Sequence, residues 1–179
     1  MFENLRFKVG LTYTRFHFRK TRDQVLQFTE AVNRADKALI IFPESATDSE
    51  SLQGVLKYLV RRFTSGNLLI VTPEDFLPVV RMGDKIPTVA YSPRDVNAWF
   101  VPRPDLLRKL KRSTFDVAFD LNVNLALPSA FLCRASNAPL RVSFAKSFAD
   151  QFYNFQIQTR ARSNSSFAYR TFLNCIEMF

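Results

Sequence analysis

Short, continuous apolar runs alternate with amphipathic stretches from Lys37 to the end of the chain. Runs such as KALIIFP and GNLLIVTP are rich in branched residues and apolar at almost every position, which is typical of strands covered on both faces. Between them, apolar residues recur every three or four positions, as they do along one face of a helix. The pattern predicts strands near residues 38–42, 68–72, 87–91, 115–120 and 139–143.

Strands that alternate with helices predict an α/β fold. Successive strands joined by helices pair in parallel, through right-handed crossovers. We therefore expect residues 37–179 to form a Rossmann-like, mostly parallel sheet with helices on both faces. Residues 1–36 differ, because aromatic side chains are interleaved with Arg and Lys over residues 1–22. We interpret them as a basic, aromatic, helical extension that packs on the domain.

The charge of the chain favours anionic partners. Lys and Arg number 25 against 16 Asp and Glu, for a net charge of +9. No nucleic-acid-binding motif accompanies the basic arm, so no nucleic-acid partner is expected. Peripheral contact of residues 1–22 with a membrane is the second interpretation of the arm, after packing on the domain. Without a signal peptide or a run near the roughly 18 apolar residues of a spanning helix, the expected location is the cytoplasm or the inner face of the membrane.

Several kinds of catalytic and cofactor site are excluded by composition. His17 is the only histidine, whereas a zinc site or a Ser-His-Asp triad needs a cluster of ligands or partners. The chain has four glycines and neither a GxGxxG nor a Walker pattern. No metal and no cofactor is therefore expected. Cys133 and Cys175 are far apart in apolar surroundings, and we expect buried free thiols.

Polar side chains follow the first and fourth predicted strands. Asp48 lies just beyond the first, and Asp120, Asn122 and Asn124 lie at and beyond the end of the fourth. Ligands of a doubly wound sheet bind outside the carboxyl ends of its strands. Carboxylates and amides on one rim could supply a general base and groups that recognise sugar hydroxyls.

The same residues also have a structural interpretation. Thr47 stands three residues before Glu50, which fits a capping box, so Asp48 could simply belong to the start of a helix. Asp120 could likewise brace a loop. Helix initiation and catalysis both stay open for Asp48 at this point.

The stretch LIIFPESATDSESLQGVL resembles the amino-terminal domain of the heptosyltransferases, a glycosyltransferase family (family 9) with the GT-B fold. In that family the first strand runs into a loop ending in Gly-Asp, followed by a helix. The family's catalytic aspartate falls on Asp48, with Thr47 in place of the glycine and Gly54 in place of the helix proline.

Two further stretches carry the resemblance to about residue 158. The segment STFDVAFDLNVNLALPSAFLCRASNAPLRVSF looks like a family segment in which Asp120, Asn122 and Arg141 match in kind. The stretch ADQFYNFQI resembles the family's Phe-Tyr-Asn stretch near the acceptor, which falls on Tyr153 and Asn154.

The resemblance implies transfer of a hexosyl or heptosyl group to a cell-envelope acceptor, which could be lipid-linked, as in lipopolysaccharide biosynthesis. Asp48 would deprotonate the acceptor hydroxyl. The substrate-binding residues would be Thr47, Asp120, Asn122, Asn124, Tyr153 and Asn154.

The family also carries a second Rossmann-like domain for the nucleotide-sugar donor, and we expect this chain to lack it. Activity would then need a partner subunit or a homodimer that completes the site. The alternative is a non-catalytic module that binds a glycan, an anionic lipid or a partner protein.

Overall fold

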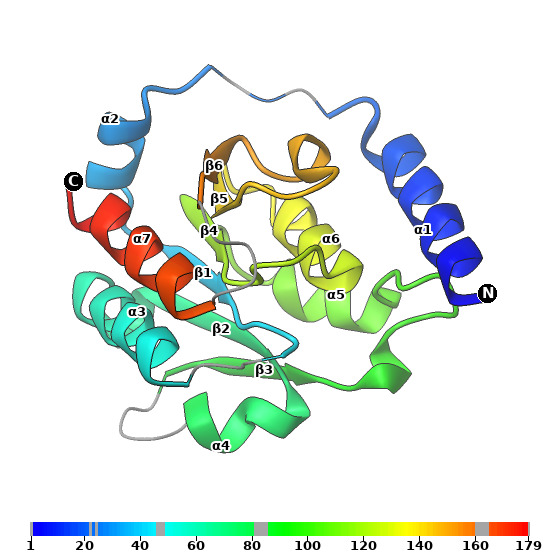
Figure 1. Ribbon diagram of the computed structural model, residues 1–179, viewed down its shortest axis with the longest axis horizontal. Helices are drawn as coiled ribbons and strands as arrows, with labels where there is room; N and C mark the ends of the chain where they lie inside the picture. Colours follow the sequence, from blue (N-terminus) through cyan, green and yellow to red (C-terminus); the bar gives the residue numbers. More distant parts are fainter. Residues whose placement is uncertain are drawn as a thin grey trace.

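The computed structural model describes residues 2–21, 23, 25–45, 49–80, 86–159 and 165–178. Within these residues a six-stranded sheet runs in the order β3-β2-β1-β4-β5-β6, and every strand pair in it is parallel (Figure 1). The strands are β1 (Ala38–Ile41), β2 (Leu68–Pro73), β3 (Thr88–Tyr91), β4 (Val117–Asp120), β5 (Leu140–Phe144) and β6 (Phe155–Ile157). The chain therefore adds β2 and β3 on one side of β1, and then β4, β5 and β6 on its other side.

Helices cover both faces of the sheet. The structure gives α1 (Phe2–Phe18), α2 (Phe28–Asn33), α3 (Ser49–Arg62), α4 (Leu77–Val80), α5 (Pro104–Leu110), α6 (Leu127–Ala135) and α7 (Ser165–Glu177). Short 3-10 turns lie at Ser65–Asn67, Glu74–Phe76, Pro93–Asp95 and Ala149–Gln151. Side chains of α2, α3, α4 and α7 pack into one apolar layer, and those of α1, α5 and α6 pack into the layer on the other face.

Strand β1 lies at the centre of both layers. All four of its residues have 0% exposure, with Ile40 facing α3 and α7 and Ile41 facing α6. A strand buried on both faces needs apolar side chains at every position, which explains its continuous apolar run. The rings of Phe119 and Phe144 extend the first layer by packing against Phe172 of α7.

The structure confirms the predicted α/β fold with a parallel sheet. Each of the five predicted strands is present within two residues of its predicted bounds. Strand β6 was not predicted, because it is three residues long and carries Gln156 at its centre. In the described part of the chain, no helix combines the length and the apolar character needed to cross a membrane.

The amino-terminal helix α1 packs against α6 and against the loop that precedes α5. Gly10 sits so close to this loop that a Cβ atom on it would lie 1.9 Å from the backbone oxygen of Trp99. Near the start of α1, Arg6 Nε donates a hydrogen bond to the backbone oxygen of Ala98 at 2.6 Å, and its guanidinium lies 4.8 Å from the ring centroid of Phe100.

A second arginine makes a similar contact near the other end of α1. Arg15 Nε donates to Gln151 Oε1 at 3.0 Å, and the guanidinium lies 5.9 Å from the ring centroid of Phe148. Phe148 and Phe100 both have left-handed backbones, with φ of 62° and 59°, which is unfavourable for bulky residues. Strained loops at two points thus hold α1 on the domain.

Candidate functional site

Asp120 lies where the strand order reverses, at the carboxyl end of β4 beside Ile41 of β1. Its Oδ1 accepts hydrogen bonds from the backbone N and the Nδ2 of Asn122, at 3.0 and 2.7 Å. Its Oδ2 accepts a hydrogen bond from the Tyr153 hydroxyl and lies 3.6 Å from Lys146 Nζ. The sequence predicted that Asp120, Asn122 and Tyr153 belong to one site, and the structure brings them together.

This cluster is buried, and burial shifts the pKa of Tyr153 and of Lys146. Burial raises the pKa of the Tyr153 phenol well above its usual value, and the charge of Asp120 raises it further, so the hydroxyl keeps its proton and donates. Burial lowers the pKa of Lys146, while the charge of Asp120 opposes that shift. Because Asp120 has 0% exposure and both of its oxygens already accept hydrogen bonds, it braces the loop after β4 instead of facing a ligand.

A second carboxylate, which the sequence analysis did not single out, faces solvent at the same edge. Glu44 follows β1, and its backbone N donates to Asn122 Oδ1 at 2.9 Å. Its Oε1 accepts from the hydroxyls of Tyr91 and Ser129, each at 3.3 Å. Partial burial of the carboxyl group raises the pKa of Glu44; the two hydroxyls oppose this shift, and the charge of Asp120 adds to it. In the sequence, Glu44 could have been identified as a carboxylate three residues after a buried strand.

Glu44 borders a cavity of about 430 Å³. Sites for small ligands commonly enclose about 300–1,000 Å³, so this one could hold a sugar-sized molecule. The polar part of its wall includes Arg6, Glu44, Glu74, Asp75, Tyr91 and Asn97. These residues come from α1, from the segments that follow β1, β2 and β3, and from the end of β3 itself. The cavity therefore lies at the carboxyl ends of three neighbouring strands, where a sheet of this kind binds ligands.

Of the predicted site residues that the structure describes, none lines this cavity. Thr47 and Asp48 lie outside the described residues, so their predicted roles stay predictions. Asn124 is in the loop after β4, where it is exposed.

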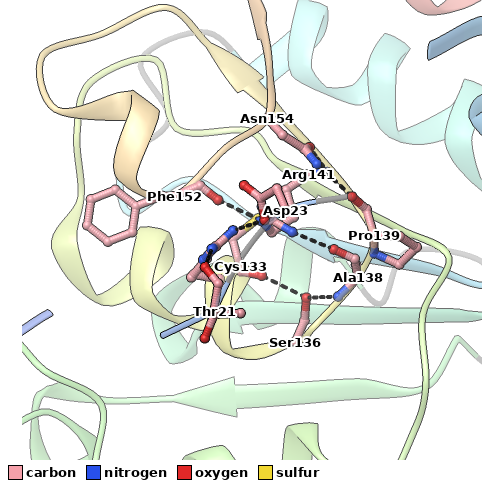
Figure 2. Close-up of polar contacts among 10 residues, drawn as sticks. Thr21, Asp23, Cys133, Ser136, Ala138, Pro139, Arg141, Phe152 and Asn154 are labelled. Carbon is pink, nitrogen blue, oxygen red and sulfur yellow. Dashed lines mark hydrogen bonds and ion pairs between the residues drawn. The ribbon is translucent and has the colours of Figure 1, made fainter. Parts of the chain in front are cut away.

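Asn154 lies at the opposite, amino-terminal edge of the sheet. Its Nδ2 donates to the backbone oxygen of Pro139 at 2.6 Å, and its Oδ1 accepts from the backbone N of Arg141 at 2.7 Å (Figure 2). Both contacts fix the start of β5 to the start of β6. Asn154 therefore does not lie beside Asp120 at the carboxyl rim, because a chain entering a parallel strand lies at the edge away from that rim, and its predicted role in acceptor binding stays a prediction.

Arg141, which matched the family segment, forms a brace at that same amino-terminal edge. Its Nη2 donates to Asp23 Oδ1 at 2.6 Å and its Nε to the backbone oxygen of Phe152 at 2.8 Å (Figure 2). Arg134 donates to the same oxygen of Asp23. Burial alone would raise the pKa of Asp23, but the two arginines outweigh it and lower that pKa. The cluster ties the segment between α1 and α2 to the domain.

Neither a metal-binding cluster in the described residues nor a matching known protein gives further information on this site. The described residues contain no group of three or more His, Cys, Asp and Glu side chains that could hold a metal ion. A scan against protein-family models, a search of curated proteins and a search of solved structures found no match to the chain. The resemblance to heptosyltransferases therefore stays a prediction from the sequence.

Proposed function

We propose that this protein binds a sugar acceptor in the cavity beside Glu44, as the acceptor-side domain of a glycosyltransferase of the GT-B type. The observation that carries the proposal is a sugar-sized cavity at the carboxyl ends of β1, β2 and β3 with Glu44, Glu74 and Asp75 in its wall. Carboxylate oxygens accept hydrogen bonds from sugar hydroxyls, and the guanidinium of Arg6, which also lines the cavity, can donate to sugar oxygens.

Glu44 is our candidate for the general base. Tyr91 and Ser129 hold one of its oxygens in place, and a carboxylate with a raised pKa is a stronger base near neutral pH. It would take the proton of an acceptor hydroxyl as that oxygen bonds to the anomeric carbon of a nucleotide-activated sugar. The bond from that carbon to the nucleotide's phosphate oxygen would break, and the nucleotide would leave with the electron pair. Asp48, four residues further along, is the other candidate for this base.

A second Rossmann-like domain, on this polypeptide or on a partner, would have to supply the donor site. Binding without transfer is therefore the second candidate function. One observation favours it: Asp120, the carboxylate nearest the reversal of strand order, is buried and committed to Asn122 and Tyr153. A domain that binds an acceptor without transferring a sugar needs the cavity. It does not need Asp120 as a second carboxylate that is free to react.

Titration of the isotope-labelled chain with free hexoses and heptoses, followed by NMR, tests the binding step. We expect shift changes at Glu44, Tyr91 and Asn97, and a roughly tenfold weaker affinity for Glu44→Gln, because a neutral amide accepts weaker hydrogen bonds than a carboxylate. Glu177→Gln, at an exposed position on α7, is the matched control and should bind as the unchanged chain does. Shift changes confined to another surface, or equal affinities for the two variants, would contradict the proposal.

The base is tested separately, by release of nucleoside diphosphate from a nucleotide sugar in the presence of the acceptor and the donor-binding domain. We expect Glu44→Gln to abolish release while acceptor binding is only weakened. Release that survives Glu44→Gln and disappears in Asp48→Asn would assign the base to Asp48 instead. Release that survives both changes would remove the catalytic part of the proposal and leave the binding part standing.

A further inference from the structure

Helix α1 carries a second apolar face that the domain does not cover. Five of its large apolar side chains are exposed, with values that reach 82% for Phe2 and 61% for Phe16. They follow one another at intervals of three or four residues, so they form one stripe along the helix. The stripe consists of Phe2, Leu5, Val9, Tyr13 and Phe16.

The stripe lies on the side of α1 that faces away from the domain. The buried residues of the helix are Gly10, Leu11 and Thr14. Leu11 stands two positions after Val9, which is about 200° around the helix axis. From Phe2 to Phe16 the stripe extends about 21 Å. A helix that is apolar on two faces normally has both of them covered, so the outer face of α1 calls for a partner.

The charges around the stripe indicate what kind of partner fits. Lys8, Arg15, Arg19 and Lys20 are exposed on α1 and the turn that follows it, against the single acid Glu3. Across the described residues, none of these four bases forms an ion pair with a carboxylate. Two copies of the chain paired through α1 would bring these like charges together, which disfavours a dimer.

We propose that α1 lies on the surface of an anionic lipid bilayer, with the stripe among the lipids and the flanking bases on the headgroups. Helices at membrane surfaces combine these two features, an apolar face with aromatic residues and flanking Lys and Arg. In Figure 1, α1 forms one side of the molecule, with the sheet and the other helices on its inner side only. Trp99 and Phe148, two further exposed aromatic residues, belong to the loops that hold α1.

This proposal stands apart from the sugar-binding proposal, because the two use different surfaces. One link between them rests on the proposed function. Arg6 belongs to α1 and also lines the cavity beside Glu44, so an acceptor anchored in the bilayer would reach the cavity from the side of α1.

Co-sedimentation of the full chain with phosphatidylcholine vesicles, with and without phosphatidylserine, tests the membrane proposal. We expect binding that requires phosphatidylserine and weakens as salt is added, because salt screens the headgroup charges. Equal binding to both kinds of vesicle, or no binding to either, would overturn the proposal.

Matched variants separate the effect of the stripe on lipid binding from non-specific adsorption and from the effect of net charge. Leu5→Ser and Phe16→Ser should each lower the partition coefficient roughly tenfold, whereas Val25→Ser, exposed outside α1, should leave it unchanged. Lys8→Glu should lower it about fivefold or more, because each base near the surface adds attraction. Lys57→Glu on α3 makes the same change in net charge and should have little effect.

All of these positions except Val25 lie on helices and all are exposed, so circular dichroism of each variant should match that of the unchanged chain. Equal losses for the α1 variants and their controls would overturn the proposal. Sedimentation equilibrium without lipid gives the other decisive outcome: a dimer that Leu5→Ser dissociates would assign the stripe to a second copy. Failure of sugar binding, measured without vesicles, would leave the result with lipid unaffected.

Discussion

Gly10→Ala offers the sharpest test of how α1 is held, because local and tertiary effects have opposite signs. Within a helix, Ala is favoured over Gly by about 1 kcal/mol, so helix propensity alone predicts a more stable protein. In the folded chain the added Cβ would lie 1.9 Å from the backbone oxygen of Trp99 and 2.9 Å from Leu127 Cδ2. Contacts of a real Cβ essentially never fall below 3.0 Å, so something must move.

The size of the stability loss depends on which atoms can move to make room for the added Cβ. The atom in the way is backbone, in a loop whose residue Phe100 already has a left-handed conformation, so α1 has to shift outward by roughly 1 Å. Overpacking of this kind costs about 1–3 kcal/mol, and the rigid neighbour points to the upper end of that range. After the gain of about 1 kcal/mol in helix propensity, we expect a net loss of about 2 kcal/mol. The loss cannot exceed the free energy with which α1 docks.

Urea unfolding followed by circular dichroism measures the loss, and limited proteolysis shows whether α1 has come away. Gly54→Ala is the matched control, because it also replaces a glycine within a helix, and its Cβ would meet nothing within 4 Å. We expect Gly54→Ala to stabilise the protein by about 0.5–1 kcal/mol. If Gly10→Ala proved equally stabilising, the close packing of α1 on the Trp99 loop would be refuted.

Three further predictions concern two buried groups and the ion pairs of Asp23. Tyr153→Phe removes the hydroxyl that donates to Asp120, so we expect a loss of about 1.5–3 kcal/mol in urea unfolding, and an unchanged midpoint would show that this bond contributes nothing. Because the folded-state pKa of Asp23 is lowered, its carboxylate stabilises the fold above its unfolded pKa of about 3.9, and that stability is lost as pH falls through the folded value. Asp23→Asn should therefore be less stable than the unchanged chain at pH 7, and the gap should close in acid; a gap independent of pH would count against the ion pairs. Burial raises the pKa of Cys133, which has 0% exposure, so Ellman's reagent should label it only on unfolding, and rapid labelling of the native chain would contradict its burial.

The strands of the sheet could be predicted because their cause is local. Each residue of β1 is buried on one face or the other, so the strand has to be apolar throughout, and such a run is visible in one dimension. The rim with Asp120 and Asn122 was also predictable, since the carboxyl ends of parallel strands share one edge. Strand β6 was not predicted, because three residues with a central glutamine show no clear apolar pattern. Its pairing with β5, and not its own sequence, makes it a strand.

The contacts that give these residues their roles join positions far apart in the chain. Glu44 becomes a candidate base because Ser129, 85 residues away, donates to it, and Asp120 becomes a brace because Tyr153, 33 residues away, does so. The pattern of α1 places apolar residues on two faces of the helix, but does not show which face the domain covers. The face with Gly10 packs on the domain, because only a residue without a side chain lets the helix backbone approach the Trp99 loop. The stripe on the other face is therefore left exposed.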